Sequence, residues 1–507
     1  MPLSDRDVCR FRRLCIVVLF TAAALYMAFT IHWPWMWDTQ IMHYAVFLTQ
    51  HGKTAYRDIY DMNMPGCYLV ERWAIDIFGG GDLGWRFYEF ALLGSMTFAA
   101  SIIARPYDWM AGLLAGVLFA IFHGVDGGAM ATERDEVITV LLLIGYAFQF
   151  LAIRKKNPLL MVPFGLSMGL AISMKPTVAL FPIALFLFAF FALKQRSEKP
   201  FLYIVYCFAG FGVVLAILLS FLLPHSLGAF LAIERIALPY YSNSSAASWG
   251  YLIRNSLPRP FLFILPASIV LALANRGQSN WEIWAVRVGV LLGALAYFVQ
   301  RKGYTYHRYP FMAFVLLWFG LECAVAMKAV TWRRTLGALS TAVAVLLVLP
   351  PKVNELRHER HNANPFADQL QVDLRHLGGS ALQGRVQCLD LATGCYSALY
   401  RLGLVQSTGF IGDLPLFAPD DGHIVSYSRT LFWNQIHENP PKVIVLSSEW
   451  FGTTYSFDKL DAWPQFRDYL NSAYTVYTSH SFGSFDNNVL AYRIYVLKQG
   501  SSPAGPS

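Results

Sequence analysis

The chain has 507 residues, of which 56% are hydrophobic and only 14% are charged, and its mean hydropathy is +0.42. This balance excludes an ordinary soluble protein, so most of the chain is expected to lie in lipid. The net charge of +8 does not indicate nucleic-acid binding, because the basic residues lie between apolar runs and form no patch beside stacking aromatic residues.

The first apolar run covers about residues 14–31 and follows a cluster of arginines. A secretory signal would be followed by a small-residue cleavage site, but this run ends in Trp33, Trp35 and Trp37, which are typical of an aromatic belt at a membrane surface. We therefore expect a helix that is retained.

Runs long enough to cross the hydrocarbon core recur along the chain and predict about eleven spans. They cover roughly residues 14–31, 86–104, 109–123, 137–153, 158–174, 176–193, 200–222, 258–274, 283–299, 310–327 and 335–350. The basic gaps fall on alternate sides, which predicts a multi-pass protein of the inner (plasma) membrane with a cytoplasmic N-terminus. An odd number of spans then places everything after Pro350 outside the cytoplasm.

Between the first two spans, residues 38–50 and 66–78 are half apolar and too short and polar to cross, so we expect them to form helices in the membrane interface. These stretches and the spans make up a predicted transmembrane domain, residues 1–351.

Residues 352–507 have a different composition, with strand-like alternation at 385–391, 442–447, 474–478 and 492–497. This pattern predicts a small extracytoplasmic α/β domain. Cys388 and Cys395 are the only two of the seven cysteines that lie close together in this segment. An oxidising compartment would permit a disulfide between them, but their spacing does not require one.

Acidic and basic residues concentrate in the outer loops, at membrane depth. Each costs about 2.5 to 3.5 kcal/mol to insert, so such residues usually have a function or a partner. The candidates are Asp38, Asp61, Asn63, Glu133, Asp135, Lys175, Arg301, Lys302, His307 and Arg308. Carboxylates opposite cations at one membrane face suit a substrate with a phosphate head group and an apolar tail, because the cations neutralise the phosphate while a carboxylate activates a hydroxyl.

The segments that carry these residues also resemble a known family. The chain reads WDTQ, HGKTAYRDIYDMNMPGCY, FGGGDLGWRF, TERDE, MKPT and KGYTYHRYP in order, and over about residues 14–350 it resembles the integral-membrane glycosyltransferases of the C superfamily. More narrowly, it is similar to the bacterial branch that includes the aminoarabinose, mannosyl and galacturonosyl transferases.

The resemblance implies a sugar donor linked to polyprenyl phosphate. Asp38 falls where the family keeps its first-loop catalytic aspartate, which implies a general-base role for it and a supporting role for Asp61. Glu133 and Asp135 are further catalytic candidates. Lys175, Arg301, Lys302, His307, Arg308 and Asn63 are candidates for substrate binding.

The family's Lys-Pro-Pro pattern is replaced here by Asn63, Met64 and Pro65, which leaves open any metal ligand expected at this point. His307 and the acids of TERDE could help hold a divalent ion, but their spacing matches no recognised metal site. No cofactor is required by the sequence.

We therefore expect hexosyl or pentosyl transfer to a lipid, glycan or protein acceptor, with membrane lipids as surroundings. Polyprenyl phosphate is an acceptable leaving group near neutral pH, so one base suffices, and direct displacement with inversion is the simplest mechanism.

Simpler explanations compete with several assignments. Asp38 could cap the helix that begins near Thr39, the TERDE segment could be a solvated turn, Lys175 could extend to the interface, and His307 could be structural. A transporter or flippase of a lipid-linked saccharide is the alternative function, although paired halves or broken helices near the midplane would then be expected.

Overall fold

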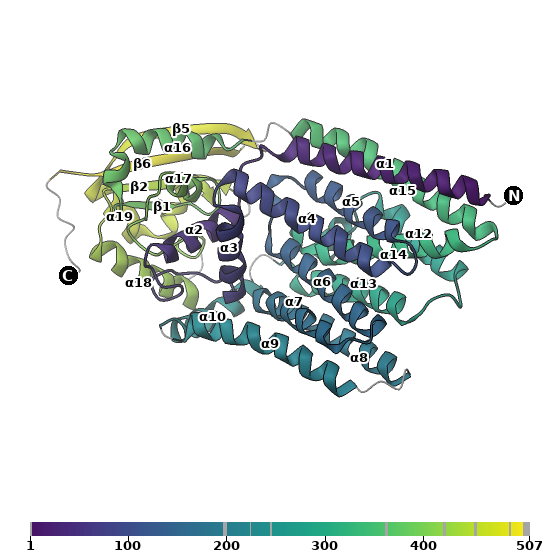
Figure 1. The fold of residues 1–507 in the computed structure, drawn as a ribbon. Coiled ribbons are helices and arrows are strands. Elements are labelled where there is room, and N and C mark those ends of the chain that lie inside the picture. Colours follow the sequence, from purple (N-terminus) through teal and green to yellow (C-terminus); the bar gives the residue numbers. More distant parts are fainter. Residues whose placement is uncertain are drawn as a thin grey trace.

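The computed structural model of the protein describes residues 3–195, 200–223, 225–243, 246–359, 363–418, 422–450, 454–485 and 488–499. A bundle of long helices forms one part, and a smaller α/β unit from the C-terminal segment lies beside one end of it (Figure 1). Helices α2 (Asp38–Gln50) and α3 (Pro65–Phe78) lie where the two parts meet.

Within the described residues, eight helical segments are long and apolar enough to cross a membrane, or nine if a bent pair is one span. The eight are built on α1 (Asp5–Thr30), α4 (Asp82–Ala104), α6 (Arg134–Arg154), α8 (Leu180–Gln195), α9 (Pro200–Leu222), α13 (Trp281–Gln300), α14 (Tyr309–Lys328) and α15 (Trp332–Glu359). The prediction of a helical multi-pass membrane protein is therefore confirmed.

All eleven predicted apolar runs are helical, but three differ from a straight, full-length span. Helices α5 (Trp109–Val125) and α7 (Met161–Met174) are apolar but shorter than the eight spanning segments, of which the one at α8 begins at Pro176. Helices α11 (Trp249–Ser256) and α12 (Phe261–Ala274) meet at a bend of 74°. Pro258 and Pro260 lie in this break, where they cannot continue the helical hydrogen bonds.

The two stretches predicted to form interfacial helices are α2 and α3. Helix α10 (Leu227–Asn243) and short 3₁₀ turns complete this part: η1 (Gly128–Met130), η2 (Pro158–Leu160), η3 (Pro176–Ala179) and η4 (Thr305–Arg308). Helix α15 continues through residue 351, so the predicted domain boundary falls inside a helix.

The C-terminal unit contains a four-stranded mixed sheet in the order β1-β2-β6-β5. The strands are β1 (Val386–Leu389), β2 (Val443–Ser447), β5 (Tyr474–Phe485) and β6 (Asn488–Leu497), with β3 (Glu449–Trp450) and β4 (Thr454–Tyr455) as a separate pair. Strand β1 is parallel to β2, and the other pairs are antiparallel. All four strand-like segments in the sequence are therefore strands.

The helices of this unit are α16 (Pro365–His376), α17 (Cys395–Arg401), α18 (His423–Glu438) and α19 (Pro464–Ala473), with 3₁₀ turns η5 (Gly379–Leu382) and η6 (Phe457–Ala462). Cys388 at the end of β1 forms a disulfide with Cys395 at the start of α17. The disulfide that the sequence permitted but did not require is therefore present.

Helix α2 packs directly on the C-terminal unit. The Gln40 side chain donates to the carbonyl of Ala392 and accepts from the Ser397 amide at 3.3 Å. The Tyr44 hydroxyl donates to the Leu404 carbonyl at 3.0 Å. Residues about 350 positions apart in sequence thereby fix the helix that begins with Asp38.

Candidate active site

Asp38 is the first residue of α2 and does not cap it. The N-cap position is Trp37, which makes no side-chain capping hydrogen bond. Trp37 has φ 54°, a conformation that costs a non-glycine residue about 1–3 kcal/mol. The explanation that Asp38 caps the helix is therefore wrong. Contacts with the surrounding structure must also hold Trp37 in this strained conformation.

The Asp38 carboxyl is half-buried between groups from distant segments. Burial raises its pKa, while the positive charge of Arg134 and a hydrogen bond from Tyr306 act in the opposite direction. The Thr39 hydroxyl donates to the Ala131 carbonyl at 3.2 Å, which ties the start of α2 to the segment that leads into α6. Asp38 thus lies beside the TERDE segment and the 304–307 loop.

Asp61 and Asn63 form a second part of the same region. Asp61 is buried, and its Oδ1 accepts from the Asn63 backbone amide at 3.0 Å and from Asn63 Nδ2 at 2.8 Å. Arg134 Nη1 donates to Asn63 Oδ1 at 2.9 Å. Burial raises the pKa of Asp61, and Arg134 opposes this shift. The guanidinium therefore links the first loop to the start of α6.

The TERDE acids are not a solvated turn, because Glu133 is 3% exposed and Asp135 2% exposed. Lys175 Nζ donates to both Asp135 oxygens, at 2.8 and 2.7 Å. His307 Nε2 lies 3.8 Å from Asp135 Oδ2. Burial and the charge of Asp38 raise the pKa of Glu133 well above its ordinary value. The acids, the lysine and the histidine therefore form one buried group.

The basic residues of the 301–308 loop have separate surroundings. Lys302 donates to the Tyr241 carbonyl and lies 4.4 Å from the centre of the Tyr241 ring. Burial lowers the pKa of Lys302. These contacts hold the Lys302 amine against Tyr241.

Arg301 and Arg308 point elsewhere. Arg301 is exposed and lies 5.1 Å from the centre of the Trp249 ring. Arg308 donates to Asp126 Oδ1 at 2.6 Å and to the Asn255 carbonyl at 2.7 Å. These contacts hold Arg308 in a structural ion pair, and neither arginine contacts Asp38, Asp135 or Lys175 in the described structure.

A second buried group lies on α4, α5 and α6. Glu89 and Glu136 flank His123, whose Nε2 is 2.9 Å from Glu89 Oε1 and 3.5 Å from Glu136 Oε2. One ligand atom from each of the three lies within 4.8 Å of the others, so this group could hold a metal ion. Two carboxylates and one imidazole suit a divalent transition metal. Arg86 pairs with Glu89, however, and would repel such an ion.

Of the residues that the sequence suggested for a metal, Glu136 of the TERDE segment belongs to this group and His307 does not. The predicted contributor His307 lies near Asp135, but both oxygens of Asp135 are bonded to Lys175. Glu89 and His123 were missed because each lies within a run that was predicted to be a membrane span. The signal in the sequence that could have found them is the free-energy cost of an ionisable side chain inside a membrane span, because such a side chain usually needs a partner. Arg134 was also missed as a site residue, although it lies between Glu133 and Asp135.

Residues 65–234 match the family model described as dolichyl-phosphate-mannose-protein mannosyltransferase. No sequence among the curated proteins matches the chain.

Two solved structures share the fold over nearly the whole chain. ArnT from Cupriavidus metallidurans bound to undecaprenyl phosphate has a TM-score of 0.62 and 12% identity, covering 97% of this chain and 99% of ArnT. The Archaeoglobus fulgidus oligosaccharyltransferase, tethered to an acceptor peptide with an NVT sequon, has a TM-score of 0.56 and 13% identity, covering 96% and 74%. With the family match, these confirm the resemblance found in the sequence.

Proposed function

We propose that this protein is an integral-membrane glycosyltransferase of the C superfamily, which transfers a sugar from a polyprenyl-phosphate donor to an acceptor. The acceptor is an envelope lipid, glycan or protein, and the reaction takes place at the extracytoplasmic face. The observation that supports this most directly is the grouping of Asp38, the adjacent Arg134 and Asp135, and Lys175, which come from three separate segments of the chain.

In this proposal Asp38 is the general base. The acceptor hydroxyl oxygen attacks the anomeric carbon, its proton passes to an Asp38 oxygen, and the bond from that carbon to the phosphate oxygen breaks. The phosphate leaves with the bonding electrons, so transfer proceeds with inversion. A carboxylate in this role contributes roughly 10²- to 10⁴-fold to the rate.

The cations of the site bind the donor phosphate. Lys175 uses two of its N–H groups on Asp135, so one ammonium proton remains for a phosphate oxygen. Arg134 uses Nη1 on Asn63 and keeps its other donors, and a guanidinium is suited to bidentate phosphate contacts. Asp61 supports this arrangement by orienting Asn63. Lys302 and His307 complete the phosphate side of the site.

Where a divalent ion is used, Glu89, His123 and Glu136 are the residues that would hold it. Such an ion would supply positive charge next to the TERDE segment, to which Glu136 belongs. Elemental analysis of the purified protein tests this: wild-type protein should hold an ion that Glu136→Gln loses. An ion retained by the variant would place the metal elsewhere.

Complementation of a deletion strain tests the function. Strains would carry the wild-type gene, Asp38→Asn or Asp58→Asn, and their envelope lipids, glycans and proteins would be compared by mass spectrometry. Asp58 is a matched control in the same loop, because it is partly exposed and pairs with Arg57 at 2.9 Å.

We expect wild type and Asp58→Asn to restore a sugar modification that Asp38→Asn does not restore. A deletion that removes no sugar modification would contradict the transferase. Build-up of the sugar-linked lipid in the cytoplasmic leaflet would instead indicate the flippase alternative.

A further inference from the structure

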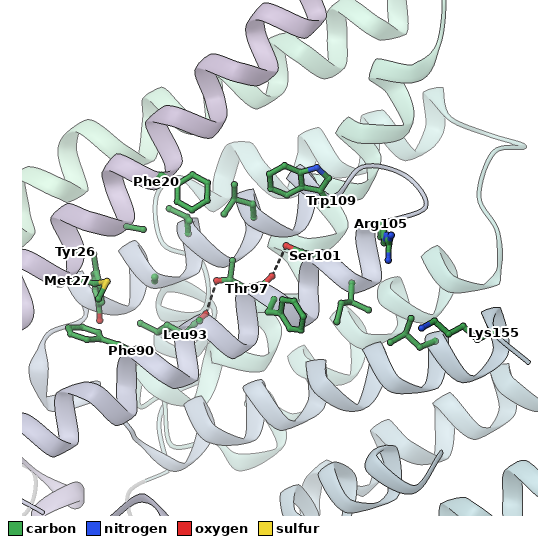
Figure 2. A pocket seen from close by; sticks show the side chains of 18 residues that line it. Phe20, Tyr26, Met27, Phe90, Leu93, Thr97, Ser101, Arg105, Trp109 and Lys155 are labelled. Carbon is green, nitrogen blue, oxygen red and sulfur yellow. Dashed lines mark hydrogen bonds between the residues drawn. The ribbon is translucent and has the colours of Figure 1, made fainter. Parts of the chain in front are cut away.

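An apolar groove of about 730 Å³ runs between α1 and α4, with α5 as its floor (Figure 2). Helix α1 is tied down at both ends of it. At one end the Tyr26 and Phe90 rings meet at 6.2 Å, and the Tyr26 hydroxyl donates to Glu89. At the other end Arg12 pairs with Asp108 at 2.8 Å. Between these contacts the groove stays open and has the size of a ligand site.

The walls of the groove offer almost no polar group. The hydroxyls of Thr97 and Ser101 donate to carbonyls of their own helix, each at 2.8 Å. Phe98 is 69% exposed and Phe20 57% exposed along it. No acidic residue is among the side chains that line it. The walls therefore suit a hydrocarbon chain.

One end is positively charged. Arg105, at the end of α4, and Lys155, after α6, line this end together with Trp109 (Figure 2). In the described structure neither cation has an acidic partner, whereas neighbouring Arg12 and Arg154 are both paired with acids. Trp109 is 43% exposed, as expected for a ring at head-group level. The two cations therefore leave charge uncompensated at the mouth of an apolar groove.

The length of the groove matches one leaflet. Phe90 and Arg105 mark its two ends on α4, so at 1.5 Å per residue it extends roughly 22 Å. Half of a bilayer with its head groups measures about 20–22 Å. At the Tyr26 end, Glu89 accepts from Tyr26 and contacts His123, and Asp38 is not among the residues that line the groove.

We propose that this groove binds an anionic phospholipid, with its phosphate at Arg105 and Lys155 and an acyl chain between α1 and α4. The head group would lie on the side that the basic gaps predict to be cytoplasmic. This site is distinct from the donor site and does not depend on the proposed function.

Lipid retention by the purified full-length protein tests the proposal. The protein would be equilibrated in micelles with equal phosphatidylglycerol and phosphatidylcholine, and bound lipid would be measured by native mass spectrometry. Wild type should retain phosphatidylglycerol preferentially. The double variant Arg105→Ala, Lys155→Ala should lose about 30-fold in this preference, since each cation contributes about 1 kcal/mol. Arg276→Ala with Lys194→Ala is the matched control, because both residues are exposed and lie outside the groove.

A second variant tests the tail site without changing charge. A Cβ atom added at Gly94, which lines the groove, meets no atom within 4 Å, so Gly94→Leu should place its side chain in the groove and reduce retention of both lipids. Gly212→Leu is its control, since Gly212 also has open space but lies outside the groove. Unchanged retention in Gly94→Leu or in the double variant would overturn the proposal. So would preferential retention of added polyprenyl phosphate, or release of the lipid by inorganic phosphate.

Discussion

Removal of the Arg134 charge should shift the pH dependence of the reaction. Arg134 favours the ionised form of Asp38, whose pKa is already raised by burial. In Arg134→Met that pKa should rise further, because this opposing positive charge is lost. The base is active when ionised, so activity should then begin to fall at a higher pH than in wild type.

The size of the shift follows from the surroundings. An opposite charge within about 4–6 Å moves a carboxyl pKa by 1–3 units. Arg134 also acts on Asp61 and Glu133, and for Asp38 its effect is smaller than that of burial. We therefore expect a shift near the low end, about 1 unit.

The assay is kcat/KM for sugar transfer as a function of pH, because its acid limb reports the pKa of the base in the free enzyme. Arg134→Lys is the control, since it keeps the positive charge and should leave the acid limb close to wild type. A uniform loss of activity in Arg134→Met, with the acid limb unmoved, would refute the assignment of Asp38 as the base.

Three further predictions concern the C-terminal unit. Gln40→Leu removes the side-chain hydrogen bonds to Ala392 and Ser397 and leaves these buried groups without partners, which should lower the unfolding free energy by on the order of 2 kcal/mol and also lower kcat. Thermal unfolding and sugar-transfer assays measure the two effects, and Gln50→Leu, at the exposed end of α2, should change neither the unfolding free energy nor kcat. Burial and the Asp390 charge raise the pKa of Glu449 to about 7, so this group stabilises the fold below pH 4.5 and its contribution is lost as pH rises through 7. The unfolding midpoint should fall over that range in wild type but not in Glu449→Gln. Reduction of the Cys388–Cys395 disulfide should lower the unfolding free energy by about 2 kcal/mol, and a midpoint insensitive to reductant would contradict this.

The sequence by itself determined the class of fold, because hydropathy and residue alternation are local signals. The apolar runs became helices, residues 38–50 became α2, and the four alternating segments became β1, β2, β5 and β6. The run at 258–274 became α12, and the bend to α11 lies at its start, at Pro258 and Pro260.

Only the tertiary structure decided which polar residues meet. Asp135 bonds to Lys175, 40 positions away, and Arg308 pairs with Asp126 instead of joining them. No periodic pattern encodes such pairs, because each depends on how helices pack against one another. The same holds for the groove between α1 and α4, whose existence depends on the space that these two helices leave between them.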